Sequence, residues 1–66
     1  MKLMLNGQAR DLQDGTTLSD LLTSLHLTEK MVLIELNGHA IPRTDFQATT
    51  LDESDTVEIV RMVGGG

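Results

Sequence analysis

One short stripe of leucines limits what this chain can fold into. Leu18, Leu21, Leu22 and Leu25 recur at i, i+3, i+4 and i+7, the spacing of one apolar helix face about two turns long. Thr17, three residues before Asp20, forms a capping-box-like start for that helix. A lone amphipathic helix of about ten residues is not stable in water, so its stripe must pack on another element. The rest of the chain must therefore build a sheet for this helix to cover.

The N-terminal residues predict a β-hairpin. Residues 2–6 alternate, with Leu3 and Leu5 on one face and Met4 on the other. The Asn6-Gly7 dipeptide suits a two-residue type I′ turn because both central residues need positive φ. Residues 8–12 then return as a second strand.

Two further strands are predicted in the C-terminal half. Residues 31–36 place Val32, Ile34 and Leu36 on one face and end at a second Asn-Gly, Asn37-Gly38. We expect residues 39–41 to pair briefly before Pro42, and residues 43–50 to be irregular and anchored by Phe46. After a turn at residues 52–55, residues 56–63 predict the last strand, with Val57 and Ile59 facing inward.

The order hairpin, helix, strand, irregular crossing, strand predicts an α+β fold. A ubiquitin-like β-grasp is the simplest closed arrangement, with a mixed sheet covered on one face by a single helix and the last strand parallel to the first. We assign residues 1–63 to this domain and Gly64, Gly65 and Gly66 to a flexible C-terminal tail, because glycine has no Cβ and accepts φ/ψ values closed to other residues.

Size and composition argue against several functions. A domain of 66 residues has little room for an enclosed active site, so we expect a carrier or binding module and not an enzyme. There is no cysteine, and His26 and His39 lack metal-ligand spacing, so we expect no bound metal or other cofactor. A net charge of -5 and a single aromatic residue disfavour nucleic acid. Without a long apolar run or a signal-peptide pattern, we expect no membrane association and a cytoplasmic location.

The glycines direct attention to the terminal carboxylate. From Met62 to Gly66 the chain could extend by about 3.3 Å per residue, roughly 16 Å in all, which would carry that carboxylate into a partner's cleft. A carboxylate is ionised at neutral pH and is a poor electrophile, so it needs activation, usually as an acyl-adenylate made from ATP. Because the chain has no Gly-rich phosphate loop, the activating enzyme must be another protein.

Several motifs along the whole chain resemble the ThiS family of sulfur carriers in bacterial thiamine biosynthesis. They are Asn6-Gly7, the helix of residues 18–25, residues 36–38 and 41–43, the acidic turn before the Val57-Glu58-Ile59-Val60 strand, and Gly65-Gly66. The resemblance implies that Gly66 is adenylated by a ubiquitin-activating-type enzyme and converted to a thiocarboxylate, a 1-thioglycine. Thiazole synthase would then use this group as its sulfur source. Gly65 belongs with Gly66 to the terminal Gly-Gly motif, and Gly64, which that motif does not require, is interpreted as additional length in the tail.

Strand alternation also predicts how partners recognise the body of the domain. It places Met4, Leu33, Val60 and Met62 on the open face of the sheet, rimmed by Glu35, Glu58 and Arg61. We interpret this exposed apolar patch as the partner-binding surface for the activating enzyme and the synthase.

Three other functions remain open at the level of the sequence. The small subunit of molybdopterin synthase also ends in Gly-Gly and carries sulfur. A ubiquitin-like modifier needs the same activation but attaches its glycine to lysine. A plain β-grasp binding module would leave the tail idle.

Overall fold

The computed structural model describes residues 1–62, which form two hairpins, one α-helix, two short 3-10 helices and a final strand. The elements are β1 (Lys2–Leu5), β2 (Gln8–Asp11), α1 (Leu18–Ser24), η1 (Glu29–Met31), β3 (Val32–Leu36), β4 (His39–Ile41), η2 (Arg43–Asp45) and β5 (Thr56–Arg61). The predicted domain boundary after residue 63 and the predicted tail, Gly64 to Gly66, lie outside the described residues.

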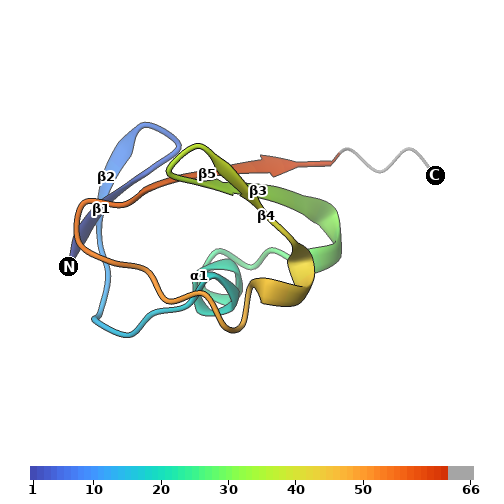
Figure 1. Cartoon of the computed structure of the whole chain (residues 1–66), viewed down its shortest axis with the longest axis horizontal. Helices are drawn as coiled ribbons and strands as arrows, with labels where there is room; N and C mark the ends of the chain where they lie inside the picture. The colour runs from blue at the N-terminus through green and yellow to red at the C-terminus, as the bar shows by residue number, and fades with distance from the viewer. Residues whose placement is uncertain (63–66) are drawn as a thin grey trace.

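The five strands form one mixed sheet in the order β2-β1-β5-β3-β4. β5 runs parallel to β1 and antiparallel to β3, and the remaining neighbours are antiparallel hairpin partners. Helix α1 lies against one face of this sheet (Figure 1). The arrangement confirms the predicted ubiquitin-like β-grasp, including the parallel pairing of the first and last strands.

Both Asn-Gly dipeptides form the predicted hairpin turns. Asn6 and Gly7 have φ values of 49° and 81°, and Asn37 and Gly38 have values of 53° and 83°. Two successive positive φ angles are the mark of a type I′ turn, whose twist matches that of the flanking strands. The turn residues therefore determine where β1 and β3 end.

Helix α1 has hydrogen-bonded caps at both ends. The Thr17 hydroxyl accepts from the Asp20 N–H at 3.1 Å, and the Asp20 carboxylate accepts from the Thr17 N–H at 3.1 Å, which confirms the capping box. At the other end His26 takes a positive φ of 60°, and the Leu27 N–H donates to the Leu22 carbonyl at 2.9 Å, as in a Schellman motif. No helix within residues 1–62 is long and apolar enough to cross a bilayer.

The core lies between α1 and the covered face of the sheet. Its buried members are Leu3, Leu5, Leu18, Leu21, Leu22, Val32, Ile34, Phe46, Leu51, Val57 and Ile59. Phe46, the predicted anchor of the crossing segment, is 1% exposed and confirms that prediction. Leu51 is equally buried and was missed, because a single leucine between Thr50 and Asp52 has no periodic neighbours.

Both 3-10 helices differ from the sequence-based expectation, while β1, β2 and α1 each end one residue earlier than predicted, at Leu5, Asp11 and Ser24. β3 begins at Val32 and not at Met31, because Glu29–Met31 forms the 3-10 helix η1. The crossing segment, predicted to be irregular, contains the short helix η2 after Pro42. Both are single turns that give no periodic signal, since a 3-10 helix of three residues has no apolar stripe.

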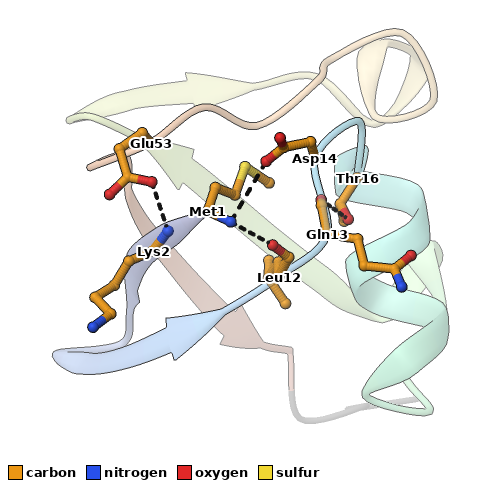
Figure 2. Close-up of polar contacts among 7 residues, drawn as sticks. All are labelled: Met1, Lys2, Leu12, Gln13, Asp14, Thr16 and Glu53. Atoms are coloured by element: carbon orange, nitrogen blue, oxygen red, sulfur yellow. Dashed lines mark hydrogen bonds and ion pairs between the residues drawn. The ribbon is translucent and has the colours of Figure 1, made fainter.

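Polar contacts stabilise the end of the sheet at which β1 begins. The α-amine of Met1 donates to the Leu12 carbonyl at 2.7 Å and lies 3.5 Å from the Asp14 carboxylate, as Figure 2 shows. The Lys2 N–H donates to the Glu53 carboxylate at 2.8 Å. These contacts tie β1 to the segments after β2 and before β5, at the opposite end of the sheet from the last described residue (Figure 1).

Candidate functional site

The strand that precedes the predicted tail is the central strand of the sheet. β5 has β1 on one side and β3 on the other. Beyond the end of β5, the Met62 N–H still donates to the Met31 carbonyl at 2.8 Å, so backbone pairing continues to the last described residue. The three glycines therefore come one residue, Val63, after a segment that is anchored on the rest of the domain.

The side chain of Asn6 extends the pairing of β5 where β1 turns away. The Asn6 N–H donates to the Val57 carbonyl at 2.9 Å, and the next residue of the chain, Gly7, belongs to the turn. The Asn6 side-chain carbonyl accepts from the Ile59 N–H at 2.8 Å, and its amide donates to the Ile59 carbonyl at 3.2 Å. The Asn6 side chain thus supplies the two hydrogen bonds to Ile59 that the backbone of β1 would make if that strand continued.

Asn37 makes a similar contact from the other hairpin. Its side-chain carbonyl accepts from the Thr56 N–H at 2.8 Å, and its amide donates to the Asp55 carboxylate at 2.9 Å. The Asn37 N–H also donates to the Thr56 carbonyl. The two turn asparagines therefore hold β5 from both sides, a role that an Asn-Gly pattern does not predict because it indicates only a turn.

The predicted patch residues all lie on the surface of the protein. Leu33 and Val60 are 59% and 58% exposed, while Met4 and Met62 are 40% and 42% exposed. Their strand neighbours Val32, Ile34 and Ile59 are buried on the helix side, as alternation requires. We call Met4, Leu33, Val60 and Met62, together with Met31, the open-face patch; Met31 is 43% exposed and was not predicted.

The strand register arranges the open face in rows. Leu33 lies directly opposite Val60, and Glu35 lies directly opposite Glu58. Arg61, predicted to rim the patch, pairs instead with Val32, a buried residue of the helix-covered face, so by alternation it does not belong to these rows. The open face therefore carries apolar rows near the end of β5 and an acidic row farther from it, and Met4, opposite Thr56, lies beyond the acidic row near the start of β5.

An open groove of about 540 Å³ borders the patch near the end of β5. Leu33 and Met62 belong to both, and Ile41 and Phe46 add further apolar lining. Lys30 and Arg43 also line the groove. The groove is open to solvent and continues the open-face patch through Leu33 and Met62.

The described residues offer little catalytic equipment of their own. Every buried side chain in residues 1–62 is apolar, and this part of the chain has no group of three or more His, Cys, Asp or Glu residues that could hold a metal ion. His26 lies at the end of α1 and His39 begins β4, both exposed. Gly66, the residue predicted to carry the chemistry, lies outside the described residues.

The comparisons with known proteins agree with the resemblance found in the sequence. The family model described as the ThiS family matches residues 3–66. The sulfur carrier protein ThiS of Bacillus subtilis is 38% identical over 65 residues, which is 97% of this chain and 98% of that protein. A crystal structure of the thiamine biosynthesis protein ThiS from Geobacter metallireducens is 33% identical, with a TM-score of 0.84 and complete coverage of both chains.

Longer proteins also contain a matching stretch. A thiazole synthase of Magnetococcus marinus is 38% identical over 66 residues, which is all of this chain and 20% of that protein. The chain thus spans about a fifth of the length of the thiazole synthases it matches. Taken with the confirmed fold and the full-length match to a sulfur carrier, the family model decides the assignment: this chain belongs to the ThiS family.

Proposed function

We propose that this chain is a sulfur carrier for the synthesis of the thiamine thiazole ring. Its working group is the carboxylate of Gly66, which an adenylating enzyme activates and a sulfur donor converts to a thiocarboxylate. The observation that carries the proposal is the extent of the family match, which runs through Gly64 and Gly65 to Gly66 itself. The described part of the domain supports it, because the chain leads into these glycines from the central strand of the sheet.

The chemistry divides between this chain and its partners. A carboxylate oxygen of Gly66 attacks the α-phosphate of ATP, pyrophosphate leaves, and the acyl-adenylate then has AMP as a good leaving group. Hydrosulfide that displaces AMP gives the thiocarboxylate directly. A persulfide donor would instead give an acyl disulfide, whose S–S bond a thiol must then reduce to release the thiocarboxylate and the donor thiol. Positioned cations must stabilise the charge that develops on the phosphates, and these would come from the activating enzyme. Glycine at position 66 leaves the terminal carbonyl unhindered for attack.

The open-face patch is the proposed surface on which the partners dock. Four of its five members lie beside the end of β5, whereas Met4 lies opposite Thr56 at the start of that strand. Three of the five are methionines, whose flexible thioethers adapt to different partner surfaces. Thiazole synthase is a proposed partner because two relatives of that name contain a stretch similar to this whole chain. We expect the protein to act as a co-substrate and not as an enzyme, in the cytoplasm.

Intact mass spectrometry tests the proposal. The chain would be incubated with ATP, a sulfur donor and a ubiquitin-activating-type enzyme from the same organism. A mass gain equal to the exchange of one oxygen for sulfur supports the carrier function, and a chain lacking Gly65 and Gly66 should show no gain. Attachment to lysines of other proteins would instead support a modifier. A second assay separates this function from molybdopterin synthesis. Thiazole synthase would be supplied with the thiocarboxylate form of the chain, and formation of the thiazole ring would support the proposal.

A further inference from the structure

Two glutamates face each other at the centre of the open face. Glu35 of β3 lies directly opposite Glu58 of β5, and both side chains are exposed. Like charges at directly opposed positions of a sheet destabilise it. Within residues 1–62 the structure has one ion pair, between Met1 and Asp14, so neither glutamate is paired with a basic side chain of the described domain.

The acidic row formed by Glu35 and Glu58 lies next to the apolar rows of the open face. The next row toward the end of β5 is the exposed pair Leu33 and Val60, and beyond it Met62 pairs with Met31. Two residues along a strand span roughly 6.8 Å, so the carboxylates lie one row from the aliphatic pair. A partner that covers the apolar rows must therefore also meet the two carboxylates.

We propose that Glu35 and Glu58 together receive a basic side chain of thiazole synthase when that enzyme covers the open-face patch. This inference rests on the proposed function and adds the chemistry of the partner surface to it. Thiazole synthase is the occupant because a sequence similar to this entire chain occurs within proteins of that name. An arginine suits the position best, since its planar guanidinium can donate to two carboxylates at once.

Such a contact would give the complex a defined register. Apolar rows alone allow one surface to slide on the other, because hydrophobic contact is not directional. A cation placed opposite two carboxylates removes that freedom and relieves their mutual repulsion. The acidic row would thus set how far the end of β5 lies from the entrance to the synthase active site.

Charge-neutral variants test the inference directly. We would measure the Kd of the full chain for thiazole synthase of the same organism by titration calorimetry, at low and at moderate salt. The variants are Glu35→Gln, Glu58→Gln and the double variant. The matched control is Asp52→Asn, which removes the same charge from the exposed turn that precedes β5, at the other end of that strand from the groove. We expect the double variant to bind about tenfold more weakly at low salt and to lose most of the salt dependence.

The outcomes separate this inference from the proposed function. Thermal unfolding of the double variant should occur at the same or a higher temperature than that of the unmodified chain, so weaker binding would not reflect unfolding. If the double variant binds as the unmodified chain does while Leu33→Ser weakens binding, docking on the open face stands and the basic contact is refuted. If the glutamate variants affect binding of the adenylating enzyme alone, the assigned occupant is wrong. Failure of the carrier function would appear instead in the mass assay.

Discussion

The side chain of Asn6 should stabilise the protein more than an ordinary turn residue does. Replacing it with glycine keeps the positive φ of 49° acceptable, so the turn itself is preserved. The change removes both hydrogen bonds to Ile59, at 2.8 and 3.2 Å. A matched variant, Asn37→Gly, removes the corresponding contacts of the other turn, which are exposed, whereas those of Asn6 are partly buried.

The expected magnitude follows from these contacts. Each hydrogen bond has a net value of about 1 kcal/mol, and leaving the partly buried N–H and carbonyl of Ile59 without their partner adds to that loss. Together with about 0.5–1 kcal/mol for the extra freedom of glycine in the unfolded chain, Asn6→Gly should cost about 3 kcal/mol. Asn37→Gly should cost about 1–2 kcal/mol, because water can replace its exposed contacts.

Urea denaturation and amide hydrogen exchange measure the effect at two levels. Denaturation gives the loss of unfolding free energy, and exchange at Ile59 reports the local contact, because its N–H donates to the Asn6 side chain. In Asn6→Gly the Ile59 amide should lose more protection than the amides of β3. The reasoning would be refuted if the two glycine variants were equally stable, or if protection fell uniformly across the sheet.

Three further substitutions test the local structure, each by urea denaturation against the unmodified chain. His26→Gly should stabilise the protein by up to about 1 kcal/mol, because residue 26 has a positive φ that glycine adopts without strain; destabilisation would show that the imidazole makes a favourable contact. Thr17→Ala should cost about 1 kcal/mol through loss of the cap to the Asp20 N–H, whereas Thr17→Ser should cost little. Leu51→Ala should cost about 2–5 kcal/mol because that side chain is 1% exposed in the core, and a cost below 1 kcal/mol would contradict its assignment there.

The local elements could be predicted because their signals are short-range. The leucine spacing and the Thr17 cap specify α1, and the two Asn-Gly dipeptides specify the hairpins. With one helix available to cover a sheet, few arrangements remain, and the β-grasp is the simplest of them. Alternation also predicted which patch side chains would be exposed, although their role in docking stays a prediction.

Other features depend on pairs of residues far apart in the chain. Burial of Leu51, the exposed position of Met31 beside Met62, and the contacts of Asn6 with Ile59 leave no local pattern. The sequence suggested Glu35 and Glu58 separately as rim residues, but nothing in it shows that they face each other.

The amino-acid sequence by itself therefore determined the turns, the helix, the alternation of the strands and the presence of three glycines after residue 63, because each depends on neighbours within a few residues. Only the tertiary structure decided the register of β5 against β1 and β3. That register brings the apolar rows together beside the end of β5 and sets two carboxylates opposite one another. The physical reason is that backbone pairing across the sheet joins residues that local conformational preferences cannot relate.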